Sequence, residues 1–396
     1  MTNMESFDNT EIETCCHSEL CGGCAFQGTA YSEQLRRKND EVIKLLTDKD
    51  IDYGEYLGIE GSPCIERYRN KMEYAFGNMD KGGGMTLGMH RKNNYMSVVT
   101  TDQCRLVDED FNSVLIATLE FCREKGYSFY NKKSHMGFLR HLILRRGVRT
   151  NELMVNLVTS SQVGLHREEY VSRLLKLKLN NTIVGIINTI NDRLSDCVNC
   201  DKLNVLWGRD YYTERIMGLG FKISVFSFFQ TNVAAVERLY SEAIAMTDDL
   251  SGKAVFDLYC GTGTISQSLA AAAKKVVGIE ISGEAIASAR ENAAYNGIDN
   301  CEFIVGDVAA VMEKLRGTPD VIVLDPPRAG VHPKALDKIV QYGAGEILYI
   351  SCNPKSLVDN LYYLQYYGYR PEKIKAFDNF PFTGHCECVA YLRKEK

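Results

Sequence analysis

Hydrophobic and polar positions follow two different rhythms along the chain. Between residues 51 and 215 the alternation is typical of strands, as in KMEYAFG, HLILRRGV and ELMVNLVTS, with helical stretches at 108–125 and 167–179. A charged helix is expected before this region, near Tyr31 to Leu46. The pattern therefore predicts an N-terminal segment over 1–50 and a mostly β central domain of the α+β class over 51–215.

After the segment FSFFQTN, helices and strands alternate. The pattern predicts helices at 231–247, 264–273 and 283–296, and strands at 254–259, 275–281, 302–306, 320–325, 346–351, 373–378 and 386–392. Such alternation is typical of a parallel, doubly wound sheet. We therefore predict a Rossmann-like α/β domain over 216–396.

Composition places the chain among ordinary globular proteins. Its 396 residues are 45% hydrophobic and 24% charged, which suits two or three domains. The first residues, MTNMESFDNTEIET, are polar and acidic, and no apolar run reaches the ~20 residues of a membrane span. We expect a cytoplasmic protein without a membrane partner. Its 14 cysteines should then be reduced thiols that serve a metal, catalysis or packing.

Charge is unevenly distributed, although the net charge is -5. Residues 61–150 carry 15 Lys and Arg against 9 Asp and Glu, and aromatic residues lie among them. The basic side chains on or beside the strand-like runs are Arg67, Arg69, Lys71, Arg140, His141, Arg145 and Arg146. Such a patch suits RNA phosphates with bases stacked nearby, and a solvated sheet face is the alternative.

Several residues at predicted strand ends suit a nucleoside cofactor. The strand ending in DLYCGTGT turns through Gly261 and Gly263, which lets the backbone approach a ligand. Glu280 ends the next strand, where it can accept hydrogen bonds from ribose hydroxyls, and Asp307 follows in VGDV. The glycines do not form GxGxxG, which favours S-adenosylmethionine over a dinucleotide. A glycine turn of another α/β fold is the alternative.

Asp325 ends the following strand in LDPPRAG, at the edge where open α/β sheets bind ligands. The DPP sequence occurs in several methyltransferases that act on bases, including exocyclic nitrogens. A turn or cap role for Asp325 is the structural alternative.

Cys352 and Glu387 are the candidates for chemistry. Cys352 follows the fifth strand in SCNPKSL, and a helix N-terminus directly after it would favour the thiolate. A thiolate that adds to C6 of uracil makes C5 nucleophilic toward a methyl sulfonium, after which a base must remove the C5 proton. Glu387 in GHCECVAYL is the candidate base. A solvated Glu387 and a buried or metal-ligating Cys352 are the alternatives.

The motifs DLYCGTGTISQSLA, LDPPRAG, SCNPKSL and HCECVAYL, with FFQTN before them, resemble the RNA uracil-5 methyltransferase family, which makes 5-methyluridine. The resemblance implies that Cys352 is the nucleophile and Glu387 the base. It also implies that Gln230, Tyr259, Glu280 and Asp325 hold S-adenosylmethionine or border the target base.

The resemblance extends to the cysteines of CCHSELCGGC. Cys15, Cys21 and Cys24 have the spacing of iron-sulfur members of the family, and Cys104 in DQCRLV is the expected fourth ligand of a [4Fe-4S] cluster. Cys16 is a competing ligand. Zinc is the rival metal, because the CxxC of Cys197 and Cys200 could join Cys21 and Cys24 around it. Without that site, Cys197 and Cys200 have no explanation.

Two expectations about RNA follow from the resemblance. Many iron-sulfur members begin with a β-barrel RNA-binding domain of the TRAM type, but only 14 residues precede Cys15, so we expect no barrel and RNA binding by the central domain. Family members that act on bacterial transfer RNA typically lack the cluster, which favours 23S ribosomal RNA over transfer RNA. An exocyclic-nitrogen methyltransferase and a non-catalytic RNA-binding factor are the other readings. No protein partner is implied.

Overall fold

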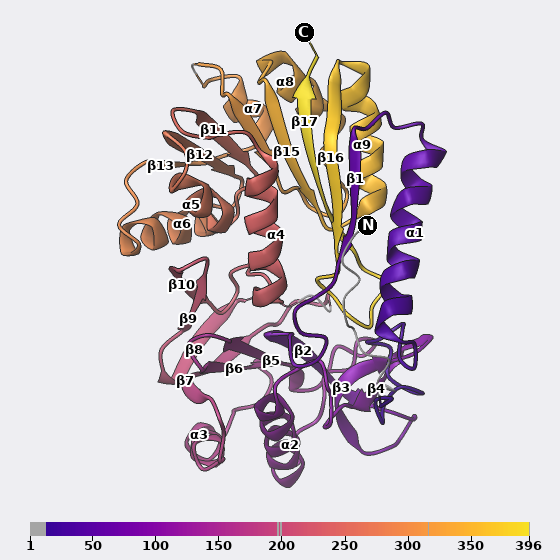
Figure 1. Cartoon of the computed structure of the whole chain (residues 1–396). Helices are drawn as coiled ribbons and strands as arrows, with labels where there is room; N and C mark the ends of the chain where they lie inside the picture. Colours follow the sequence, from indigo (N-terminus) through magenta and orange to yellow (C-terminus); the bar gives the residue numbers. More distant parts are fainter. Residues whose placement is uncertain (1–12, 196–197, 199, 316, 396) are drawn as a thin grey trace.

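Two β-sheets organise the chain, one above the other in Figure 1. The computed structural model describes residues 13–195, 198, 200–315 and 317–395. The upper sheet has eight strands and the lower sheet has seven, and a two-stranded hairpin lies between them. None of the helices in these ranges is long and apolar enough to cross a membrane.

The eight-stranded sheet has the order β1-β16-β17-β15-β14-β11-β12-β13. Its strands are β1 (Glu55–Glu60), β11 (Ala254–Leu258), β12 (Lys275–Glu280), β13 (Cys301–Val305), β14 (Val321–Leu324), β15 (Glu346–Ser351), β16 (Tyr369–Phe377) and β17 (Glu387–Lys394). Strands β11 to β15 are parallel, whereas β17 runs antiparallel to both of its neighbours. The predicted doubly wound α/β domain is confirmed.

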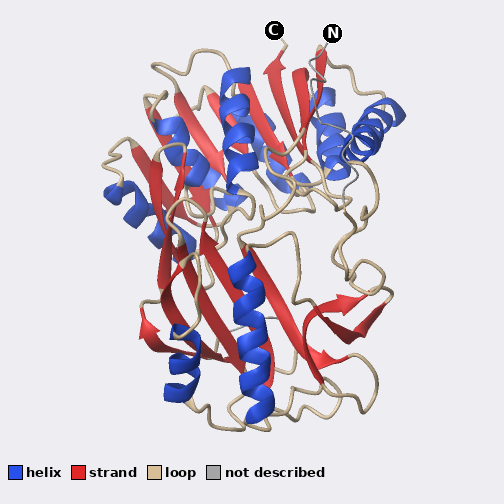
Figure 2. Cartoon of the chain, turned by 60° about the horizontal axis from the view of Figure 1, so that its bottom comes forward, coloured by secondary structure: helices blue, strands red, loops and turns tan. Residues whose placement is uncertain are grey.

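Helices cover both faces of this sheet, which is why its central strands are continuous apolar runs (Figure 2). One face packs against α4 (Val233–Met246), α5 (Thr264–Ala270) and α6 (Gly283–Tyr295). The other packs against α1 (Tyr31–Asp48), α7 (Val308–Met312), α8 (Pro333–Tyr342) and α9 (Pro354–Tyr366). In β14, all four residues are buried.

Residues 31–60 contribute to the C-terminal sheet. Helix α1 packs beside α9, and β1 pairs in parallel with β16 at the edge of the sheet. The sequence pattern assigns residues 51–60 to the central domain, and the strand pairing places β1 elsewhere. The sequence of a six-residue edge strand such as β1 does not indicate which strand it pairs with. The other domain limits stay a prediction.

The seven-stranded sheet has the order β4-β3-β2-β5-β6-β7-β8. Its strands are β2 (Lys71–Asn78), β3 (Met85–Arg91), β4 (Asn94–Thr100), β5 (Leu139–Gly147), β6 (Glu152–Thr159), β7 (Thr182–Ile190) and β8 (Lys202–Gly208). Helices α2 (Glu109–Glu124) and α3 (Arg167–Leu175) pack on one face. The hairpin β9 (Tyr211–Ile216) and β10 (Leu219–Ser224) packs on the other face and also against α4, so one apolar core joins the two sheets.

Candidate active site

The carboxyl edge of the parallel strands gathers the residues that the sequence singled out. Loops after β11, β12, β13, β14 and β15 all open at this edge, where doubly wound sheets bind their ligands. Strand β17 returns antiparallel, so its first residue, Glu387, lies at the same edge. Ser351 at the end of β15 pairs with Cys388, which brings the neighbouring Cys352 and Glu387 together.

Cys352 lies between β15 and α9, partly buried. Asn353 caps α9, and its side-chain oxygen accepts a hydrogen bond from the Lys355 amide at 3.2 Å. Burial, and then the negative charges of Glu387 and Asp325, raise the pKa of the Cys352 thiol to about 11. The sequence predicts a thiolate favoured by the helix N-terminus. In the structure burial, and then the two carboxylates, act in the opposite direction, so the thiol without ligands has a raised pKa.

The carboxyl groups of Glu387 and Asp325 also have raised pKa values, which favour their protonated forms. Burial, with the charge of Asp325 adding to it, raises the pKa of Glu387 to about 8. Burial alone raises the pKa of Asp325 to about 7. Arg328 opposes the shift at Glu387, and it also lowers the pKa of Cys352. Three neighbouring groups that each have a raised pKa would be stabilised in their ionised forms by a nearby cation.

Arg328 and Tyr240 are site residues that the sequence prediction missed. The guanidinium of Arg328 lies 3.0 Å from Nδ1 of His385, and its carbonyl accepts a hydrogen bond from the Asn353 side chain at 2.9 Å. Arg328 follows DPP directly, so the motif could have indicated it. Tyr240 accepts a hydrogen bond from Nε2 of Gln230 at 3.3 Å. In the sequence, Tyr240 cannot be distinguished from the other buried residues of α4.

Tyr240 places Gln230 beside the two acids. Burial, and then the negative charge of Asp325, raise the pKa of Tyr240, and Glu387 contributes to the same shift. The carbonyl of Gln230 accepts a hydrogen bond from the Asn70 side chain at 2.9 Å, which ties the segment to the start of β2. Gln230 therefore lies where the two sheets meet.

The glycine turn after β11 has the geometry expected of a ligand loop. Gly261 has a φ of +53°, and a Cβ atom built there would meet nothing within 4 Å. Its amide donates to the Glu280 carboxylate at 3.3 Å, and the Ser282 amide donates to the same carboxylate at 2.9 Å. Gly263 has a φ of +75° and begins α5, where a Cβ would lie 2.8 Å from the Phe303 ring. Gly261 therefore leaves open space beside the turn, and Gly263 allows α5 to pack closely against Phe303.

Tyr259 and Asp307 extend this edge. Tyr259 adopts a left-handed backbone with a φ of +70°, a conformation that costs free energy in a residue with a side chain. Burial, and then the charge of Asp307, raise the pKa of Tyr259 to about 12, which places the two side chains near each other. Asp307 caps α7 by accepting from the Ala310 amide at 3.1 Å.

Asp257 adds another buried acid that sequence reasoning did not select. It lies in β11, accepts a hydrogen bond from the Ser266 hydroxyl, and its second oxygen has no partner among the described residues. Burial raises its pKa to about 7. The open space at Gly261 and the surrounding carboxylates fit a nucleoside that carries positive charge, as S-adenosylmethionine does.

The four cysteines predicted to bind a cluster lie near one another. Burial, and then the charges of Cys24, Cys15 and Cys21, raise the pKa of Cys104 to about 12. In the described ranges, however, no three His, Cys, Asp or Glu side chains are arranged to hold a metal ion. An iron-sulfur site therefore stays a prediction.

The remaining cysteines of that prediction differ in position. Cys16 is exposed, and its thiol lies 3.8 Å from the Gln103 side-chain oxygen. Cys200 is also exposed, and the charges that act on it after burial come from Asp201 and Glu284 rather than from the other cysteines. Cys197 lies outside the described residues. The zinc alternative gains no support from these positions.

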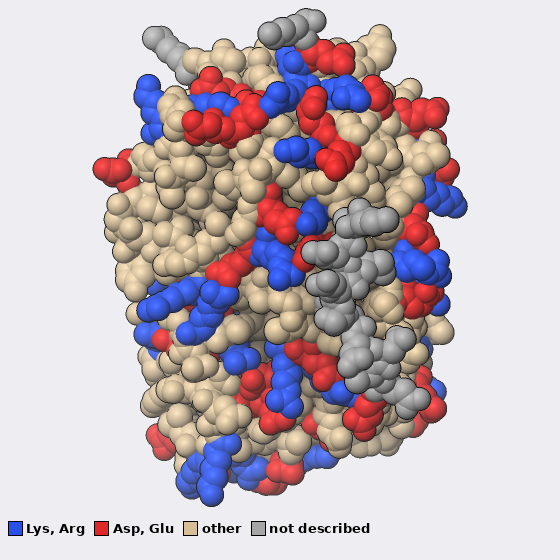
Figure 3. All heavy atoms as spheres, viewed as in Figure 1, with Lys and Arg blue, Asp and Glu red and all other residues tan. Residues whose placement is uncertain are grey.

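Most of the predicted basic patch serves the fold. Arg140 and Arg145 are 3% and 2% exposed, and each donates to backbone carbonyls. Arg146 pairs with Asp108 at 2.9 Å, Lys71 pairs with Glu73 at 2.7 Å, and Arg67 pairs with Glu109. For Arg140 and Arg145 both the expected phosphate contact and the solvated sheet face are wrong, because sequence shows charge without showing burial. Figure 3 shows Lys and Arg interspersed with Asp and Glu on the face in view.

Comparisons with known proteins agree with this geometry. The family described as tRNA (Uracil-5-)-methyltransferase matches residues 30–395. Two proteins named uncharacterized RNA methyltransferases, from Clostridium tetani and Caldanaerobacter subterraneus subsp. tengcongensis, are 48% and 47% identical. The alignments cover 95% and 97% of this chain and 82% and 85% of theirs.

A solved structure is similar over most of its length. It is the tRNA (uracil-54, C5)-methyltransferase of Pyrococcus abyssi in complex with S-adenosyl-L-homocysteine, with a TM-score of 0.76 and 28% identity. The match covers 94% of this chain and 86% of the other.

Proposed function

The chain belongs to the tRNA (uracil-5-)-methyltransferase family of RNA methyltransferases, and on that premise we propose that it methylates C5 of one specific uridine in RNA. The observation that carries the proposal is the meeting of Cys352 and Glu387 at the carboxyl edge of the sheet. A methyltransferase acting on an exocyclic nitrogen needs neither residue.

In this reaction the Cys352 thiolate adds to C6 of the target uracil, forming a C–S bond and an enolate. S-adenosylmethionine supplies an electrophilic methyl group. The electron pair at C5 would take that methyl group as the S–CH3 bond breaks and S-adenosylhomocysteine leaves, and the C5 proton would then pass to the Glu387 carboxylate. The C–S bond breaks as the ring double bond re-forms, which returns Cys352 to the enzyme. Arg328 partly offsets the charge of the two acids, which keeps Glu387 closer to the ionised form that it needs.

The residues that would hold the cofactor surround the glycine turn. Glu280 suits the ribose hydroxyls, and the mostly buried Asp325 suits positive charge near the methyl group. The proposed set is Gln230, Tyr259, Gly261, Gly263, Glu280, Asp307 and Asp325.

We also propose a [4Fe-4S] cluster on Cys15, Cys21, Cys24 and Cys104. Its support is the family resemblance together with the mutual influence of these thiols. Cys24 and Cys104 border a small apolar cluster around Tyr68, Leu106 and Phe382, so a cluster there would be partly shielded from water.

The RNA target has two candidates. The cysteine pattern favours 23S ribosomal RNA, whereas the similar Pyrococcus abyssi enzyme is a transfer RNA methyltransferase. We favour ribosomal RNA as the target, and we propose that the domain of the seven-stranded sheet binds it. We also propose that the enzyme is cytoplasmic.

The test is methyl transfer from labelled S-adenosylmethionine to unmodified transcripts of 23S ribosomal RNA and of transfer RNA. The product nucleoside is identified by mass. We expect 5-methyluridine in the ribosomal transcript alone. Label in transfer RNA alone would overturn the target but keep the chemistry, and a methylated exocyclic nitrogen would overturn the chemistry itself.

A further inference from the structure

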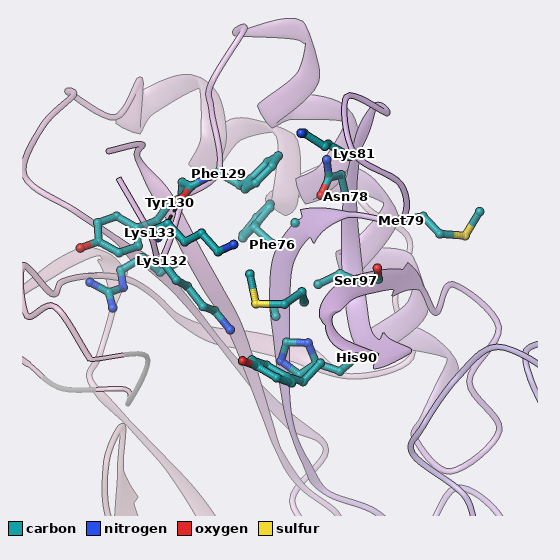
Figure 4. A pocket seen from close by; sticks show the side chains of 17 residues that line it. Phe76, Asn78, Met79, Lys81, His90, Ser97, Phe129, Tyr130, Lys132 and Lys133 are labelled. Atoms are coloured by element: carbon teal, nitrogen blue, oxygen red, sulfur yellow. Dashed lines mark hydrogen bonds between the residues drawn. The ribbon is translucent and has the colours of Figure 1, made fainter. Parts of the chain in front are cut away.

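A cavity of about 400 Å³ lies in the lower sheet, away from the candidate active site. Its walls come from the ends of β2 and β3, from the first part of β4, from residues 129–133, and from the start of β5. Figure 4 shows Lys132 and Lys133 on one wall, with Lys133 extending toward Phe76. Nothing in the proposed methyl transfer uses this cavity.

Aromatic rings line the cavity, and one of them, Tyr95, is exposed rather than packed in the core. Phe76 and Tyr130 are buried at its floor, whereas Tyr95 at its rim is 70% exposed. The Lys132 ammonium lies 6.0 Å from the Tyr95 ring centre. An exposed ring beside a cation is a stacking surface for an unpaired base, because every base has a π-face that such a ring can cover.

The charges on the cavity are all of one sign. Lys81, Lys132, Lys133 and Arg140 line it, and none of the described residues that line it carries a carboxylate. Arg140 is 3% exposed and its guanidinium lies 4.1 Å from the Tyr130 ring centre. Its Nε is buried without a hydrogen-bond partner within the described part of the chain. Another guanidinium nitrogen, Nη1, donates to the carbonyls of Asn191 and Arg193, so Arg140 adds fixed positive charge to the wall of the cavity.

The cavity is too far from the catalytic residues to hold the target base. Asn70, just before β2, contacts Gln230 beside the active site. Phe76 lies six residues further along the strand, which is about 20 Å at ~3.3 Å per residue. A nucleotide in the cavity is therefore a different nucleotide of the same RNA.

We propose that this cavity binds a second, unpaired nucleotide of the RNA substrate and so helps to select the RNA. The base stacks on Tyr95, and the lysines bind its phosphate. This inference rests on the proposed function only in taking RNA as the ligand. It assigns target selection to a site separate from the chemistry.

The test compares Tyr95→Ala with Tyr366→Ala, which removes an 83% exposed tyrosine from α9. Binding of the 23S ribosomal RNA and transfer RNA transcripts is measured by filter retention, and melting temperatures check that both variants fold. We expect about 5- to 100-fold weaker binding for Tyr95→Ala and less than twofold change for Tyr366→Ala. KM for RNA should rise in Tyr95→Ala while kcat at saturating RNA stays unchanged.

Abasic substitutions placed one at a time in the RNA identify the bound nucleotide. At the correct position, loss of the base should weaken binding to the wild type but not further weaken binding to Tyr95→Ala. Unchanged binding by Tyr95→Ala, or additive losses at every position, would overturn the inference. If no transcript is methylated, the proposed function fails, and the binding measurement still decides the role of the cavity.

Discussion

Burial and the negative charge of neighbouring Glu387 raise the pKa of the Cys352 thiol to about 11. The two residues lie side by side because Ser351 at the end of β15 pairs with Cys388 near the start of β17. Burial, and then the charge of Asp325, raise the pKa of both Tyr240 and Glu387, so the site without ligands keeps its protons. A positively charged cofactor would oppose these shifts, which links cofactor binding to activation of the thiol.

Cys352→Ala should abolish covalent attachment to RNA that contains 5-fluorouridine. Fluorine cannot leave C5 as a proton does, so the wild type should stay attached to such RNA through C6. Denaturing electrophoresis measures the attached fraction. Cys64→Ala, which changes an exposed cysteine, is the matched control and should attach as the wild type does. Attachment by Cys352→Ala would remove this residue from the proposed role.

Glu387→Gln should slow turnover by about 10²- to 10⁴-fold, the usual contribution of a positioned general base. The variant can still add Cys352 to C6 and transfer the methyl group, but it cannot take the C5 proton. Covalent adduct should therefore accumulate on ordinary uridine RNA, where the wild type shows none after denaturation. Wild-type turnover, or a slow variant that forms no adduct, would assign proton removal to another group.

Glu387→Gln should also change how stability depends on pH. The pKa of Glu387 is about 8 in the fold against an ordinary value of 4.5, so the folded protein keeps a proton that the unfolded chain releases. The stabilising contribution of this proton is complete below pH ~4.5 and is lost as pH rises to about 8. The melting temperature of the variant relative to the wild type should thus rise between pH 5 and pH 8.5.

Asp325 and Asp257 titrate in the same range and affect both proteins, so only the difference between the two melting curves reports on Glu387. A constant difference across this pH range would show that Glu387 is ionised in the fold at neutral pH.

Strand order made the candidate site predictable from sequence. Asp325 and Cys352 each follow an apolar run, and the ends of parallel strands meet at one edge of a sheet. Glu387 begins a strand that runs the other way, and the local sequence pattern does not indicate that it returns to the same edge.

The central sheet shows where sequence reasoning failed. Arg140 and Arg145 stand in HLILRRGV and its flank, where charge suggests solvent, yet both are buried with backbone carbonyls as partners. Tyr95 and Lys133, by contrast, were not predicted as site residues from the sequence. They line one cavity only because β3 pairs with β4 and residues 129–133 lie beside that pair. The local sequence pattern indicates the periodicity of a strand, but it does not indicate which distant groups a long side chain will contact.

The segment from Cys15 to Cys24 should bind iron. The bound iron should in turn stabilise the contact between this segment and the hairpin of β3 and β4. The Gly22 amide donates to the His90 carbonyl at 2.9 Å, and the Lys92 amide donates to the Leu20 carbonyl at 2.8 Å. Anaerobic reconstitution should give about four iron atoms per chain, as a [4Fe-4S] cluster requires. Cys24→Ser should lose most of the iron, and Cys16→Ser, which changes an exposed thiol, should keep it.

Loss of iron should then loosen the two hydrogen bonds to the hairpin. Faster amide hydrogen exchange is expected at Gly22 and Lys92 in Cys24→Ser, with no change at Val323 in the centre of the other sheet. Because the hairpin also carries Tyr95, RNA binding should weaken in parallel. Equal iron in the two variants would refute the ligand set. Iron loss with unchanged exchange would show that the cluster does not support the hairpin.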